Sequence, residues 1–193
     1  MELVFSNYNE DSTFQKAVAS NQNFKNLEFD NCTFTEIDFS NSEFLSCKFD
    51  ECTFSNCNLS SIQLNNSQLN DVSFVDCKVL GVHFEECSDF LFSVSFDACN
   101  LDYCTFYKKK LVQTTISNSS LKQVDFSEAD LTKSSFNNSN LFETLFYRTN
   151  LTEADFRTAQ NFSIDPMENQ LKKAKFSREN LEGLLEKFQL KIY

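Results

Sequence analysis

The sequence predicts an all-β fold, a four-sided parallel β-helix with a C-terminal α-helix. Three observations of the repeated part predict the β-helix. Large apolar residues recur every five positions, small or β-branched residues stand two positions before them, and the 193 residues include only 2 Gly and 1 Pro. Neither a 3.6-residue helix nor a simple alternating strand produces a period of five.

The repeat centres are almost all Phe or Leu. They run from Phe24 to Phe84 and from Leu91 to Phe156, giving 27 centres with a single seven-residue step between the two series. Residues i−2 and i of a short extended segment point to the same side. We therefore expect both to face inward, with a corner after each centre. Four corners close a coil of 20 residues, so the 27 repeats make about 6.75 coils.

The eight cysteines share the inward i−2 position, which Cys87 occupies only if the register continues into the irregular step. The set is Cys32, Cys47, Cys52, Cys57, Cys77, Cys87, Cys99 and Cys104. The paired C-x2-C spacing of zinc sites is absent, so we interpret these residues as free thiols that fill the core. Lys109 is the main exception to the small or β-branched residues at i−2.

The two ends depart from the repeat. In residues 1–23, Phe14 and Ala19 keep the spacing, and we expect a capping coil or short helix, because an open end exposes the core and the strand edge. Residues 24–176 form the predicted β-helix. Ser177 is a candidate N-cap for a C-terminal helix and tail in residues 177–193.

The C-terminal helix is expected to have one apolar face, because its large apolar residues follow the i, i+3, i+4, i+7 pattern. This face and the following tail comprise Leu181, Leu184, Leu185, Phe188, Leu190 and Ile192. One interpretation is a lid on the last coil. The other is that these residues also form the interface of a symmetric homodimer, the commonest oligomer.

The sequence contains no catalytic, nucleotide-binding or metal-binding motif of the common classes. We therefore expect no enzymatic activity, no cofactor and no metal. The net charge of −11 argues against direct binding to nucleic acid or an anionic membrane. The N-terminus lacks a signal-peptide pattern and no apolar run approaches a membrane span, so a cytoplasmic location with reduced thiols is expected.

Several segments match the motif A(D/N)LXX, including Ala-Asp-Leu-Thr-Lys at 129–133, Ser-Asn-Leu-Phe-Glu at 139–143 and Ala-Asp-Phe-Arg-Thr at 154–158. Over about residues 24–160, the chain resembles the pentapeptide-repeat family, which implies a right-handed quadrilateral β-helix. Its ending, with Ile-Asp-Pro at 164–166 and a Leu-Leu helix, resembles the Qnr and MfpA quinolone-resistance proteins. In those relatives, terminal helices join two β-helices into a rod that resembles B-DNA and engages DNA gyrase and topoisomerase IV.

The charge distribution fits this resemblance in part. Residues 24–106 hold 14 Asp or Glu and 3 Lys or Arg, a net charge of −11, so the rest of the chain sums to zero. The leading hypothesis is a DNA-mimicking topoisomerase binder, and the alternative is a scaffold for an unrelated protein partner. The candidate partner contacts are Asp30, Glu36, Asp38, Glu43, Asp50, Glu51, Glu85, Glu86, Asp89, Phe90 and Phe92. The interruption at residues 85–93 is interpreted as a tolerated bulge or a short contact site.

Overall fold

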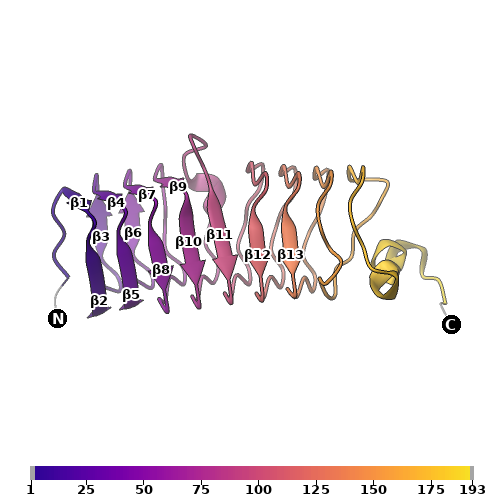
Figure 1. The fold of residues 1–193 in the computed structure, drawn as a ribbon, viewed down its shortest axis with the longest axis horizontal. Coiled ribbons are helices and arrows are strands. Elements are labelled where there is room, and N and C mark those ends of the chain that lie inside the picture. Colours follow the sequence, from indigo (N-terminus) through magenta and orange to yellow (C-terminus); the bar gives the residue numbers. More distant parts are fainter. Residues whose placement is uncertain (1–2, 192–193) are drawn as a thin grey trace.

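A computed structural model describes residues 3–191, which form a rod of stacked four-sided coils (Figure 1). The N-terminal and C-terminal segments lie at opposite ends of the rod. The strands are β1 (Tyr8–Glu10), β2 (Thr13–Val18), β3 (Asn23–Lys25), β4 (Glu28–Asp30), β5 (Thr33–Asp38), β6 (Glu43–Leu45), β7 (Lys48–Asp50), β8 (Thr53–Ser55), β9 (Gln68–Asn70), β10 (Val72–Val75), β11 (Val94–Asp97), β12 (Thr115–Ser117) and β13 (Ser135–Asn137). The helices are all of the 3-10 type: η1 (Phe84–Glu86), η2 (Arg178–Leu184) and η3 (Glu186–Phe188).

The strands form three parallel sheets on different sides of the rod. Their orders are β1-β4-β7-β9, β2-β5-β8-β10-β11-β12-β13 and β3-β6. Phe34 pairs with Phe54 and Phe54 with Phe74, an offset of 20 residues, while Val72 pairs with Val94, an offset of 22. The predicted four-sided coil of 20 residues is therefore confirmed, and one coil carries the two extra residues.

The interior consists of apolar side chains stacked from coil to coil. Phe34 and Phe54 are stacked with ring centroids 4.6 Å apart, and Phe84 and Phe106 with centroids 4.5 Å apart. Rings from neighbouring sides meet edge to face, as Phe29 and Phe34 do at 5.2 Å. Both arrangements are favourable for aromatic quadrupoles, so the repeated centres build one continuous core.

The corners of the coils form almost without glycine. The second residue after most repeat centres has a left-handed backbone, with φ of 47° at Asn31, 57° at Asn41 and 61° at Lys133. This conformation costs a non-glycine residue roughly 1–2 kcal/mol, less for Asn and Asp. The corner N–H groups offset part of that cost by bonding to the next coil, as Asn31 does to the Asp50 carbonyl at 2.9 Å.

The N-terminal end carries the coil pattern into the segment expected as a cap. Strand β1 pairs with β4, and β2 pairs with β5, both with the 20-residue offset. Phe5 packs edge to face against Phe14, Phe24 and Phe29. Ordinary coil structure therefore begins at β1, and Phe5 packs against the first rings of the core.

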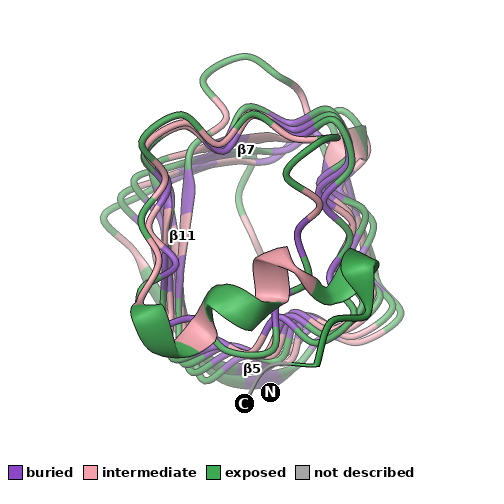
Figure 2. Ribbon diagram, turned by 90° about the vertical axis from the view of Figure 1, so that its right-hand side faces the viewer, coloured by how far each residue is buried: buried purple, intermediate pink, exposed green. Residues whose placement is uncertain are grey.

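The C-terminal helix is present, with 3-10 rather than α-helical hydrogen bonding over Arg178–Leu184 and Glu186–Phe188. Ser177 precedes it but forms no side-chain capping bond. A 3-10 helix rises about 2.0 Å per residue, against about 1.5 Å in an α-helix. The same residues therefore reach further across the open end of the last coil, which the helix crosses in Figure 2.

Candidate interaction surfaces

One side of the N-terminal coils carries rows of carboxylates. On the sheet β1-β4-β7-β9, Glu10 pairs with Asp30, and Asp30 pairs with Asp50. The residue that follows each of the four strands lies at a corner with positive φ, and these residues form a second row. That row is Asp11, Asn31, Glu51 and Asp71. We call the four segments 8–11, 28–31, 48–51 and 68–71 the acidic face.

The acidic face holds seven carboxylates and one lysine, which gives a net charge of −6. Lys48 pairs with Glu28 at 2.7 Å across neighbouring coils. The pKa of the Tyr8 hydroxyl is raised by loss of solvation and by the negative charges of Glu10 and Asp30. A deprotonated, negative tyrosine is disfavoured there, as expected beside a row of like charges.

The structure separates the acidic residues that the sequence placed in one group. Asp30, Asp50 and Glu51 lie on the acidic face. Glu36 and Asp38 belong to β5 in the seven-stranded sheet, and Glu43 belongs to β6 in the two-stranded sheet. Glu85 and Glu86 lie in η1, with Glu85 bonded to Nδ1 of His83 at 2.8 Å. These residues therefore face different directions around the rod.

Four carboxylates of the acidic face were missing from the sequence-based candidates: Glu10, Asp11, Glu28 and Asp71. The signal that identifies them is the 20-residue offset, since residues 10, 30 and 50 must stack once the coil length is known. Two of them lie in the segment expected as a cap. Charge counted along the chain could not reveal this alignment, because each side of the coil receives only every fourth repeat.

The two extra residues form a loop at residues 88–92, which projects beyond the side of the rod that carries β7 (Figure 2). Phe90 is 64% exposed and Leu91 is 58% exposed. Leu91 was expected as a repeat centre, and that prediction is wrong, because its φ of 55° places it at a turn. Phe92 instead packs against the core, 6.4 Å from Phe84. Of the two phenylalanines proposed as contacts, Phe90 is therefore the more accessible.

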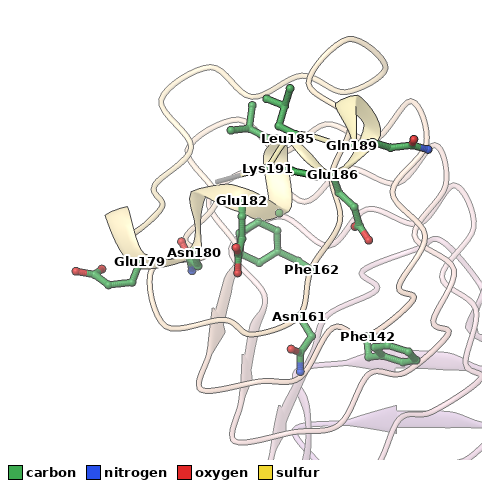
Figure 3. A pocket seen from close by; sticks show the side chains of 12 residues that line it. Phe142, Asn161, Phe162, Glu179, Asn180, Glu182, Leu185, Glu186, Gln189 and Lys191 are labelled. Carbon is green, nitrogen blue, oxygen red and sulfur yellow. The ribbon is translucent and has the colours of Figure 1, made fainter. Parts of the chain in front are cut away.

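The C-terminal end contains an open pocket of about 900 Å³ between the terminal helix and the last coils (Figure 3). Its walls combine apolar side chains, such as Phe162 and Leu185, with Glu182 and Glu186. The expected interface residues divide between two environments. Leu184 packs against the core and Leu185 is half-buried, whereas Leu181, Phe188 and Leu190 are exposed. Ile192 lies outside the described residues.

All eight cysteines are buried and free, which confirms their interpretation as core thiols. Burial raises the pKa of Cys52 and of Cys104 to about 12, so the reactive thiolate is scarce at neutral pH. Residues 3–191 contain no group of three or more His, Cys, Asp or Glu positioned to hold a metal. Over the same residues, no helix has the length and apolar character needed to cross a bilayer.

Known proteins resemble the chain in its repeats and its overall shape. A family model described as a pentapeptide repeat region matches residues 9–84, 47–126 and 81–156. A trypsin-treated variant of QnrB1, a plasmid-mediated fluoroquinolone resistance protein, is 19% identical, with a TM-score of 0.67 over 96% of this chain and 91% of the QnrB1 chain. Full-length QnrB1 is 18% identical, with a TM-score of 0.57 over 92% of this chain and 100% of its own. No curated protein sequence is significantly similar. The chain belongs to the pentapeptide-repeat family.

Proposed function

We propose that this protein binds a type II topoisomerase, DNA gyrase or topoisomerase IV, by presenting its acidic face where the enzyme otherwise holds DNA. The observation that carries the proposal is the alignment of carboxylates along one side of a rod. The fold is shared with QnrB1, a fluoroquinolone resistance protein. Competition with DNA at this position would blunt the action of quinolones.

The spacing of charge on the acidic face supports DNA mimicry. Four coils at the sheet spacing of roughly 4.8 Å span about 19 Å. A net charge of −6 over that length is one charge per roughly 3.2 Å, close to the ~3.4 Å per charge of one DNA strand. A protein surface built to bind a DNA backbone would therefore meet a similar density of negative charge.

The partner surface is expected to be basic and the contact protein to protein. Because these carboxylates stand on a rigid sheet, the backbone needs no ordering when they bind, which favours affinity. Opposite charge also accelerates association of two proteins. The loop tip with Phe90 and Leu91 projects on the same side, so apolar contact can accompany the charged contact. The apolar loop tip would help to select one partner among proteins with basic surfaces, because charge alone does not distinguish these surfaces.

We further propose that two copies join at their C-terminal ends into a longer rod. Leu181, Phe188 and Leu190 are exposed beside the open pocket at that end. Covering them with a second copy would remove apolar surface from water. Replacing Leu181 and Phe188 with Glu should convert dimers to monomers in light scattering. A matched change of the exposed Val112 and Val18 to Glu should leave the mass unchanged. A monomeric wild-type mass at micromolar concentration would contradict this part of the proposal.

The test of function is gyrase supercoiling with and without ciprofloxacin across a titration of the protein. The expected result is restored supercoiling in the presence of the drug, or inhibition of supercoiling at high protein concentration. The variant Asp30→Asn with Asp50→Asn serves as the control, since it should need a higher concentration for the same effect. An absence of both effects, together with capture of an unrelated protein partner, would instead support the scaffold alternative.

A further inference from the structure

Lys109 is a buried lysine inside the β-helix. It is 1% exposed and occupies the i−2 position, where nearly all the other repeats carry small or β-branched side chains. Among residues 3–191, no other charged residue is buried. Burying an ammonium group is strongly unfavourable unless it is paired and hydrogen-bonded, so its partners reveal why it is there.

The partners of Lys109 all belong to the segment that leads into and forms the 88–92 loop. Its Nζ donates to the Cys87 carbonyl oxygen at 2.6 Å and to Asp89 Oδ1 at 2.7 Å. It also lies 4.9 Å from the centre of the Phe92 ring, a favourable distance for a cation–π contact. One ammonium group therefore connects the start, the middle and the end of the inserted segment.

The bond to Cys87 departs from the pattern of the ordinary coils. In those coils, a short i−2 side chain donates to a carbonyl of the preceding coil, as Thr149 Oγ1 does to Phe126 at 2.9 Å. Lys109, with a longer arm, instead donates to the carbonyl of Cys87, which itself stands at an i−2 position. The longer side chain therefore reaches into the segment that carries the insertion, where the expected repeat centre Leu91 turns outward.

The ion pair links a buried group to an exposed one. The Lys109 side chain is 2% exposed, whereas the Asp89 side chain is 84% exposed. Releasing the loop would leave the ammonium group without its carboxylate in a buried site, which is strongly unfavourable. Because the buried ammonium group of Lys109 needs the Asp89 carboxylate, it favours the loop conformation in which the two are paired.

We propose that Lys109 is a clamp that holds the 88–92 loop in one conformation, with Phe90 and Leu91 presented to solvent as a preformed tip. The clamp goes beyond the proposed function, because it operates whichever partner the tip meets. A preformed tip binds without first losing conformational freedom, which favours affinity. An unclamped loop of the same sequence would have Phe90 and Leu91 free to fold back onto the rod.

Chymotrypsin digestion under native conditions tests the clamp, since this protease cleaves after Phe and Leu and the tip offers both. Lys109→Met keeps an apolar arm but removes the charge, and Asp89→Asn removes the carboxylate from the exposed end. Both variants should be cut in the loop about tenfold faster or more, as cleavage follows the population of open loop. Lys110→Met, a change in the exposed neighbour, should be cut at the wild-type rate.

The double variant separates a clamp from two unrelated effects. If Asp89 acts through Lys109, the double variant is cut no faster than Lys109→Met alone. If the rate increases of the two single variants multiply in the double variant, the clamp is wrong. It is also wrong if both single variants are cut at the wild-type rate and melt at the wild-type temperature. Should Lys109→Met fail to fold, Asp89→Asn decides the question, because Asp89 is exposed and its replacement leaves the core intact.

Discussion

The same side of the rod has opposite charge before and after the loop. The acidic face, in four coils before the loop, has a net charge of −6. Beyond the loop, the corresponding segments 110–113, 130–133, 150–153 and 170–173 hold two acidic and four basic residues, a net charge of +2. Coils with the same backbone thus carry different surfaces, so the fold alone does not select a partner.

The interior of the two regions is, by contrast, alike. Phe34 is stacked on Phe54 at 4.6 Å before the loop, and Phe126 is stacked on Phe106 at 5.2 Å after it. Both Phe34 and Phe126 have no exposed surface. We infer that the shared interior provides stability, and we propose that the outward positions that differ provide recognition.

The largest expected effect comes from the core and should be the same in both regions. Phe34→Ala and Phe126→Ala should each lower the free energy of unfolding by about 3–5 kcal/mol, as for other buried aromatic residues. Chemical denaturation measures both. If one variant is much less destabilised than the other, the two interiors are not equivalent and the comparison fails.

Charge removal should affect binding in one region only. Asp30→Asn with Asp50→Asn should weaken gyrase binding about tenfold, which corresponds to about 1.4 kcal/mol. Asp130→Asn with Glu153→Gln removes the same number of charges beyond the loop and should leave affinity unchanged. Equal losses in the two double variants would show that total charge, rather than the acidic face, determines binding.

Salt should have a smaller effect on gyrase affinity, and this effect should again depend on the acidic face and not on the charges beyond the loop. Raising NaCl from about 50 mM to about 200 mM screens exposed charges, so wild-type affinity for gyrase should fall. The decrease should be shallower for Asp30→Asn with Asp50→Asn and unaltered for Asp130→Asn with Glu153→Gln. Isothermal titration at each salt concentration gives the slopes, and identical slopes in all three proteins would exclude a role for the acidic face.

The smallest expected effect concerns a corner residue. Gly81 has φ of 63°, and an added Cβ would meet nothing within 4 Å. Gly81→Ala should therefore be destabilising through backbone conformation alone, by about 1 kcal/mol. Gly81→Asn should cost less, since Asn adopts the left-handed conformation more readily. Thermal unfolding distinguishes the two variants. Equal melting temperatures would show that Asn has no advantage over Ala at a left-handed corner.

The sequence predicted the coil because its spacing is a direct consequence of geometry. An inward residue at every fifth position is compatible with few backbones, and the 20-residue repeat follows from four sides. The cysteines were also placed correctly, since a small apolar thiol suits the inward i−2 position. Both predictions depend on local periodicity and need no information about distant partners.

The remaining features depended on contacts between coils. Phe90, Leu91 and Phe92 are three adjacent apolar residues, and spacing alone could not decide which one turns inward. Lys109 was recognised as an exception, but Asp89 becomes its partner only when the inserted loop closes. The C-terminal pattern fitted an α-helix, whereas the observed helix is of the 3-10 type, with Leu184 packed against the core and Leu181 exposed.

Competition with DNA tests directly whether the acidic face takes the place of DNA on a topoisomerase. Labelled duplex DNA bound to gyrase is titrated with the protein, and fluorescence anisotropy reports release of the DNA. We expect the wild-type protein and the variant Asp130→Asn with Glu153→Gln to release the DNA, and Asp30→Asn with Asp50→Asn to release it more weakly. Binding of the protein to gyrase without release of DNA, or equal release by both double variants, would contradict this proposal.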